Sequence, residues 1–173
     1  MGEERRTSRR SEFRLPFQWR LLTEGDSLAT QIRRWSLEDV LQRQQRTAFL
    51  ETDFEQAARA IPDSATSTAL RALQTRLELL ESATAALTPT PSKSYLELST
   101  DGVGFWSKQP LTEGDQLVVH IVLPGGYQLV ASACVSHSQP QPDKDGTPAY
   151  RIGARLSQLD PVSGRRLTRL IIS

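Results

Sequence analysis

One abrupt change of pattern constrains the fold more than any other feature of the sequence. Residues 23–92 are rich in Ala, Leu, Gln, Glu and Arg, which favour helices, and they contain few β-branched apolar residues. Residues 94–156 instead consist of short segments that alternate apolar and polar residues between turns. Pro89 and Pro91 lie at the boundary and end any helix that reaches them. We therefore expect a β structure with a helical block inserted near its beginning.

The β segments are short and regularly spaced. They cover 13–22, Tyr95–Leu98, Gly102–Trp106, Gln116–Leu123, Tyr127–Val135 and Ala149–Leu156. The polar stretch 138–147 is expected to be a loop, and Asp160 followed by Pro161 predicts the start of a short C-terminal helix. Short antiparallel strands at this spacing are typical of a small barrel or sandwich.

The helical block contains three start signals. Ser36 and the acid three residues later have the spacing of a capping box. Asp53 indicates a second start, of a short piece that ends near Ile61. A third helix is expected at about 64–88. We expect Trp35 to pack this block against the β part.

The third helix has the clearest periodicity in the chain. Its apolar residues alternate at spacings of three and four, which makes a heptad a/d series with one polar interruption. The series comprises Leu70, Leu73, Leu77, Leu80 and Leu87. A second apolar row, which includes Leu79, indicates that the helix packs on two sides. We therefore expect a coiled-coil homo-oligomer assembled through this helix, although an amphipathic helix within a monomer has the same pattern.

The composition argues against several classes of protein. No apolar run approaches the ~20 residues of a membrane-spanning helix. The charged first residues lack the apolar stretch of a secretory signal, so we expect a cytoplasmic protein with no membrane span. The net charge of +1 is too small for a general DNA-binding protein. An RNA-binding barrel would need aromatic residues on the polar faces of its strands, and these faces have few. We therefore expect neither DNA nor RNA as a partner.

Residues for catalysis or metal binding are scarce. Cys134 is the single cysteine, which excludes a disulfide framework and a CxxC metal site. His120 and His137 are too far apart in sequence for a zinc motif or a His-based triad, and we expect both to be structural. The chain contains no nucleophile elbow, Walker loop or full GxGxxG motif. We expect no enzyme activity, no catalytic or metal-binding residue and no cofactor.

Arginine is concentrated at the two ends of the chain. Residues 1–14 contain five arginines and residues 151–169 contain five more, whereas the whole chain has only three lysines. A guanidinium group forks onto phosphate and stacks on flat rings better than an ammonium group does. Residues 1–12 lack apolar periodicity and are expected to form a flexible, arginine-rich arm.

Two short motifs carry a resemblance to a known family. Arg10-Ser-Glu-Phe-Arg14 has the form RxxxR, follows Arg9 and lies just before the first strand. Glu97-Leu-Ser99-Thr-Asp-Gly102 has the form (D/N)xSxxG, with Glu at the acid position, between two strands. A glycine in the last strand, Gly153, matches a third feature. In order and spacing these segments resemble the PilZ domains, which are bacterial receptors for cyclic di-GMP.

The resemblance implies a fold and a ligand. The implied fold is mainly β, a six-stranded antiparallel barrel of residues 13–22 and 93–173 with a helical insertion at 23–92 and a short C-terminal helix. The implied function is a cyclic di-GMP receptor that rearranges on binding and signals to a protein target that the sequence does not identify. The implied ligand contacts are Arg9, Arg10, Arg14, Glu97, Ser99 and Gly102.

Each implied contact has a chemical basis. The guanidinium groups fork onto phosphate or a guanine edge, and the arm folds over the barrel on binding. Ser99 offers a hydroxyl, and Gly102 lets the backbone approach the ligand. The pairs Arg5/Arg9 and Arg6/Arg10 have the same spacing as the preferred pair Arg10/Arg14. Ser99 and Gly102 also fit an ordinary tight turn.

The departures from the family pattern leave a second function open. Glu97 has one methylene more than the Asp or Asn of the family, which changes the reach of its carboxylate. The helical block resembles that of the tetrameric PilZ variants, which oligomerise through heptad helices and in which loss of the motifs accompanies loss of nucleotide binding. The alternative is an oligomeric scaffold that acts only by protein–protein contact. Because the motifs are largely retained here, the receptor is the leading hypothesis.

Overall fold

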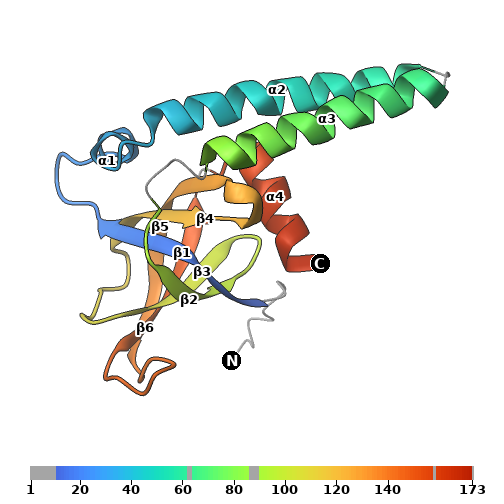
Figure 1. Cartoon of the computed structure of the whole chain (residues 1–173). Helices are drawn as coiled ribbons and strands as arrows, with labels where there is room; N and C mark the ends of the chain where they lie inside the picture. The colour runs from blue at the N-terminus through green and yellow to red at the C-terminus, as the bar shows by residue number, and fades with distance from the viewer. Residues whose placement is uncertain (1–10, 62–63, 86–89, 158, 173) are drawn as a thin grey trace, which may run out of the picture.

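A closed barrel forms the body of the protein (Figure 1). The computed structural model describes residues 11–61, 64–85, 90–157 and 159–172. Within these residues six antiparallel strands close in the order β1-β2-β3-β6-β5-β4, which confirms the expected barrel. The strands are β1 (Ser11–Leu21), β2 (Lys93–Leu98), β3 (Gly102–Ser107), β4 (Gln116–Val122), β5 (Gln128–Pro140) and β6 (Tyr150–Ser157).

Strand β1 closes the barrel by pairing with two neighbours in turn. Its first half, Ser11–Pro16, pairs with β2, and its second half, Phe17–Leu21, pairs with β4. Pro16 lies where the pairing passes from one neighbour to the other, a place where a missing N–H is tolerated. The proline therefore does not break the strand, which starts two residues earlier than the sequence predicts.

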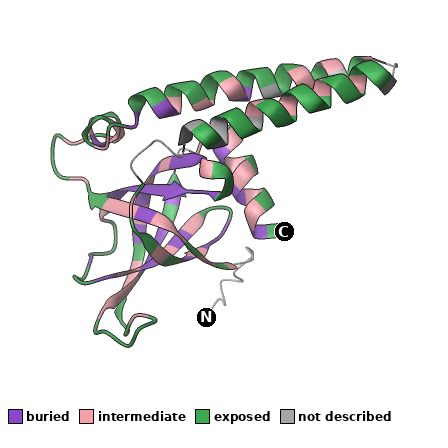
Figure 2. Cartoon of the chain, in the orientation of Figure 1, coloured by how far each residue is buried: buried purple, intermediate pink, exposed green. Residues whose placement is uncertain are grey.

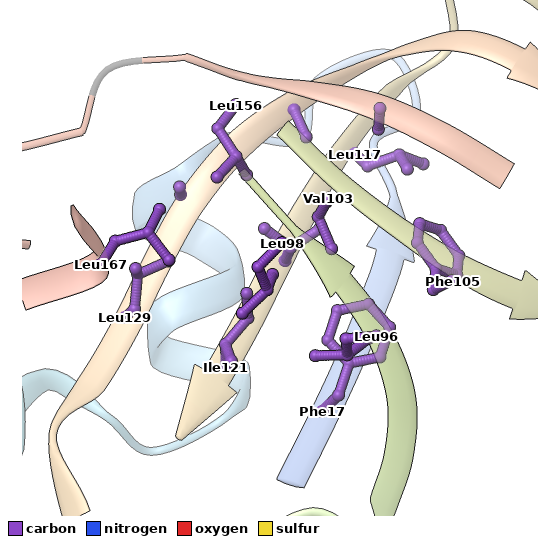
Figure 3. Packing of buried hydrophobic residues seen from close by; sticks show 14 of the residues in the cluster. Phe17, Leu96, Leu98, Val103, Phe105, Leu117, Ile121, Leu129, Leu156 and Leu167 are labelled. Carbon is purple, nitrogen blue, oxygen red and sulfur yellow. The ribbon is translucent and has the colours of Figure 1, made fainter. Parts of the chain in front are cut away.

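The core lies inside the barrel and is built by strand alternation (Figure 3). Phe105 is its aromatic centre, with ring centroids 5.1 Å from Phe17 and 5.5 Å from Trp19. Ala131 and Ala133 on β5 face the same interior and leave room for these rings. The inward positions are apolar, and the alternate positions point to the outside. Because the interior is filled with apolar side chains, a ligand can reach only the outside of the barrel.

The insert consists of a short helix and a long helical hairpin (Figure 1). Helix α1 (Leu28–Arg34) is followed by α2 (Glu38–Ala60) and α3 (Ser64–Ala85). The expected capping box does not form, because Ser36 adopts a φ of 54° and α2 has Leu37 as its N-cap. The predicted helix start at Asp53 is also wrong, since no helix-breaking residue precedes it and α2 continues through it.

Strand β4 is buried on both faces because the insert covers its outside. Leu117, Val119 and Ile121 point into the barrel core. The alternate residue His120 is fully buried, and its ring lies 5.7 Å from the Trp35 ring between α1 and α2. Trp35 therefore packs the insert against the barrel, as the sequence predicts.

A buried polar network fixes this junction. Gln18 of β1 donates to Nδ1 of His120 at 2.9 Å, and Nε2 of His120 donates to Oε1 of Gln128 at 2.6 Å. The side chain of Gln44 on α2 completes the network by bonding both the N–H and the C=O of Gln128. This pattern requires a neutral imidazole with its proton on Nε2, since Nδ1 accepts.

The stability of the protein should decrease as the pH falls below about 6.5. Burial lowers the pKa of His120 below its ordinary value of 6.5. The unfolded chain therefore takes up the proton first, so stability is full above pH 6.5 and is lost as the pH falls toward the folded pKa. Urea unfolding between pH 7.5 and 5 measures this effect. The variant His120→Gln should lose part of the pH dependence, and an identical slope in both proteins would exclude His120 as its source.

The C-terminal part differs from the sequence prediction in one place. The predicted loop at 138–147 begins later, because Ser138–Pro140 continue β5 and pair with β6. Helix α4 (Pro161–Ile172) begins as predicted, with the Asp160 carboxylate accepting from the N–H groups of Val162 and Ser163. Among the described residues, no helix combines the length and the apolar character that crossing a bilayer needs.

Candidate functional site

The two sequence motifs meet on the outside of the barrel. In β1 the exposed position Arg14 pairs with Tyr95 of β2, and Glu12 pairs with Glu97. Glu97 in turn pairs with Gly104 of β3, and Gly104 pairs with Gly153 of β6. We call the surface formed by Arg14, Tyr95, Glu97, Gly104 and Arg151 the outer face.

The guanidinium group of Arg14 rests on an aromatic ring. It lies 5.4 Å from the centroid of Tyr95, and both side chains are exposed. Such a contact is worth only about 0.5–1 kcal/mol at an exposed site. Arg14 is therefore positioned by its strand but remains able to exchange Tyr95 for a stronger anionic partner.

The acid of the second motif is held by an arginine from a distant strand. Arg151 of β6 makes two bonds to the Glu97 carboxylate, Nε to Oε1 at 3.1 Å and NH2 to Oε2. The two side chains are only 23% and 14% exposed, so this forked pair is well shielded from water. Gly104 lies beneath it, where a Cβ would come within 3.2 Å of the Cβ of Glu97.

Ser99 and Gly102 form the turn between β2 and β3. The Ser99 hydroxyl donates to Oδ1 of Asp101 at 3.0 Å, and the Ser99 N–H donates to the Gly102 carbonyl at 2.9 Å. A Cβ on Gly102 would lie 3.1 Å from the Ser99 Oγ and 3.3 Å from the carbonyl oxygen of Ala154. A side chain at this position would therefore be crowded, and its neighbours would have to shift by a few tenths of an ångström. Ser99 is 5% exposed, so its hydroxyl has a structural role in this state.

A side-chain-free strip borders the ion pair. Gly104 and Gly153 face each other across β3 and β6, and the imidazole of His137 on β5 covers the place where a Gly153 Cβ would stand. Gly153 is therefore buried beneath the imidazole, whereas Gly104 is only half-buried. His137 therefore lies at one border of this surface and Glu97 at the other.

The loop between β5 and β6 reaches the same surface. Lys144 bonds Glu12 at 2.8 Å, and its ammonium lies 5.5 Å from the Trp106 ring centroid. The Trp106 indole donates to the Pro142 carbonyl at 3.2 Å. These contacts place a further cation beside the start of β1, where the arginine arm begins.

The structure brings together part of the predicted site. Arg14 and Glu97 lie on one face, and Ser99 and Gly102 form the turn at its end. Arg9 and Arg10 lie outside the described residues. Sequence reasoning did not assign Arg151 to the site, although alternation along the last strand places it on the outside with Arg155. Nothing local in the sequence indicates that β6 pairs with β3, and for this reason the contact with Glu97 was missed.

The leucines of the predicted heptad series differ in how far they are buried within the hairpin. Leu70 and Leu77 are half-buried, whereas Leu73 and Leu80 are 52% and 66% exposed. Leu87 lies outside the described residues. Leu79, together with Phe49 and Leu50 of α2, is also exposed. Exposed residues therefore run along both helices of the hairpin (Figure 2).

Removing the partner of Glu97 should destabilise the barrel. The variant Arg151→Gln leaves a shielded carboxylate without its fork, which should cost about 2 kcal/mol of unfolding free energy. Arg155→Gln removes an exposed arginine from the same strand and should cost less than about 0.5 kcal/mol. Urea unfolding compares the two variants, and equal losses would contradict a special role for the ion pair.

Comparison with known proteins agrees with this architecture. The described residues form a closed antiparallel barrel, and among them no group of three His, Cys, Asp or Glu could hold a metal ion. Residues 81–173, more than half of the chain, match the PilZ domain, so the chain belongs to the PilZ domain family. No curated protein matches the sequence.

Three solved structures are similar to this chain at low sequence identity. A tetrameric PilZ domain protein from Xanthomonas campestris, self-assembled through a helical bundle, shares 16% identity at a TM-score of 0.54. The match covers 96% of this chain and 87% of that one. The Bacillus subtilis inhibitor of motility shares 19% identity over 46% of this chain and 40% of its own, at a TM-score of 0.39. The PilZ domain of YcgR from Escherichia coli, solved with c-di-GMP, shares 19% sequence identity at a TM-score of 0.35. That match covers 47% of this chain and 71% of the other.

Proposed function

We propose that the protein is a non-catalytic receptor for cyclic di-GMP that binds its ligand on the outer face. Family membership makes this ligand the first candidate. The observation that carries the proposal is the register of β1 against β2, in which Arg14 lies opposite Tyr95, two residues before Glu97 on the same side of β2. The two motifs, separated by more than 80 residues in the sequence, thus come together where one ligand reaches both.

The charges of this surface suit a guanine nucleotide. Guanine presents N–H donors on one edge and the acceptors O6 and N7 on another. The Glu97 carboxylate accepts hydrogen bonds, and the Arg14 and Arg151 guanidinium groups donate to a phosphate or to O6 and N7. On this proposal the base lies beside Gly104, which carries no side chain, and against the imidazole of His137 that covers Gly153.

The Glu97–Arg151 pair lowers the cost of binding, because Arg151 already fixes the Glu97 carboxylate. A ligand therefore does not have to order this long side chain itself. On this proposal the pair stays formed, and the base bonds to the remaining lone pairs of the carboxylate and the remaining N–H groups of Arg151. The arm then closes over the ligand, which is the rearrangement that a protein target detects.

The hairpin supports assembly as a homo-oligomer. Five large apolar side chains of α2 and α3 are exposed, namely Phe49, Leu50, Leu73, Leu79 and Leu80. The Xanthomonas protein assembles as a tetramer through a helical bundle, and its fold covers the hairpin as well. We propose that the exposed leucines of α3 associate with those of another copy. This same observation favours the second candidate, an oligomeric scaffold that binds no nucleotide.

Calorimetry distinguishes the two candidates. Cyclic di-GMP is titrated into the purified protein at moderate salt, with GTP and cyclic di-AMP as controls. The receptor requires saturable binding of cyclic di-GMP, at micromolar or lower concentration, and at least about tenfold weaker binding of both controls. Absence of heat with all three nucleotides would leave the scaffold as the function.

A further inference from the structure

A cleft lies where the helical hairpin meets the barrel. Its volume is about 330 Å³, and its walls come from α2, α3, α4 and η1 (Pro124–Gly126), the turn after β4. Figure 1 shows α4 packed beneath the hairpin at this place. None of the lining residues belongs to either of the two sequence motifs.

The wall formed by α4 is strongly basic. Arg165, Arg166 and Arg169 line the cleft within little more than one helical turn, and Glu55 of α2 is the one acidic residue among the described residues of its lining. Three guanidinium groups this close together attract an anion. Each guanidinium offers a fork of N–H groups that fits phosphate oxygens.

One of these guanidinium groups is held in place. Arg166 lies 4.4 Å from the centroid of the Tyr127 ring. Tyr127 is 8% exposed, and its hydroxyl lies 3.0 Å from the Ser163 hydroxyl, which is itself bonded to the N-cap Asp160. Binding therefore costs little additional ordering of Arg166, because the ring already restricts it.

The remaining lining has an apolar part, here called the floor, and two polar side chains from the hairpin. Leu123, Pro124, Val162 and Leu170 form the apolar part. Thr52 and Gln74 provide a hydroxyl and an amide from the two hairpin helices. The cleft therefore combines a cationic wall with a surface that favours a hydrocarbon or ring body. Its size is at the lower end for small-molecule sites.

We infer that this cleft binds a small organic phosphate, with the phosphate on the arginines of α4 and the apolar body on the floor. Phosphate fits better than a single carboxylate because its additional oxygens and charge engage more than one guanidinium fork. The ligand would contact the hairpin and the barrel together and so tie them to each other. This site is independent of the outer face and of cyclic di-GMP.

Phenyl phosphate is a direct probe, and inorganic phosphate, which lacks the apolar ring, is its control. Each is titrated into the ¹⁵N-labelled full chain and followed by amide chemical shifts. Both should saturably shift the amides of Tyr127, Val162 and Leu170, and phenyl phosphate should bind at least about tenfold more tightly because its ring buries apolar area. Shifts confined to Arg14, Glu97 and their strands, or no saturable shift, would overturn the site. Equal affinity of the two probes would contradict the claim that the apolar part of the ligand binds in the cleft.

Variants on the two walls test the assignment separately. Arg165→Gln with Arg169→Gln should weaken phenyl phosphate at least about tenfold, and both side chains are exposed, so the fold should persist. Thr52→Glu places a negative charge on the part of the cleft formed by α2 and should weaken the binding of phenyl phosphate by a similar factor. Arg46→Gln with Arg71→Gln removes two exposed arginines that do not line the cleft and should leave binding unchanged. Unchanged binding in the first two variants would refute the proposal.

Discussion

The variant Arg14→Ala should bind cyclic di-GMP at least about thirty-fold more weakly than the wild type, or not at all. A forked, charge-assisted contact contributes about 2 kcal/mol, and its loss corresponds to this factor in affinity. The fold should be unaffected, because the Arg14 side chain is exposed and stacks on the exposed ring of Tyr95. Calorimetry measures the affinity, and thermal unfolding shows whether the barrel is intact.

Arg20→Ala is the matched control for this variant. Arg20 lies on the same strand, is also exposed and pairs with β4 instead of β2. Its loss removes the same charge from the same element, so binding should change less than about twofold. If both variants lose affinity equally, the effect is one of net charge, and the assignment of Arg14 to the ligand site is wrong.

The double variant Leu73→Asp with Leu80→Asp should convert the oligomer into monomers. Both side chains are exposed in the single chain, so a carboxylate there costs the monomer little. In a helical bundle the same carboxylates would be buried without partners, at a cost of several kcal/mol per subunit. Light scattering should then show a mass near that of one chain, 19.3 kDa, at concentrations where the wild type is larger.

Ile172→Asp controls for the general effect of removing an exposed apolar residue. Ile172 and Leu80 are both 66% exposed, but Ile172 lies at the end of α4 and not on the hairpin. This variant should keep the wild-type mass. A wild type that is monomeric throughout, or a double variant of unchanged mass, would contradict the proposed assembly through α3.

The sequence predicts the barrel well because its signals are local. Alternation fixes which residues of each strand face inward, and Asp160 with Pro161 marks the start of α4. Local signals mislead where a longer context decides. Asp53 resembles a helix start but lies inside a helix that was already under way.

The candidate site is only partly accessible from the sequence. The motifs name Arg14 and Glu97, but the ion pair between Glu97 and Arg151 joins two strands whose residues lie 54 positions apart in the sequence. The burial of His120 likewise depends on the insert that covers β4, and the cleft beside α4 depends on where the hairpin packs. These features arise from tertiary packing, which no short window of sequence contains.

Chemical-shift mapping of cyclic di-GMP on the full chain tests the central claim most directly. The receptor on the outer face predicts saturable shifts at Arg14, Tyr95, Glu97, Gly104 and Arg151, with the amides around α4 unaffected. Saturable shifts that avoid these strands would move the ligand to another surface. No shifts at any ligand concentration would contradict the receptor and leave an assembly that acts through protein contacts alone.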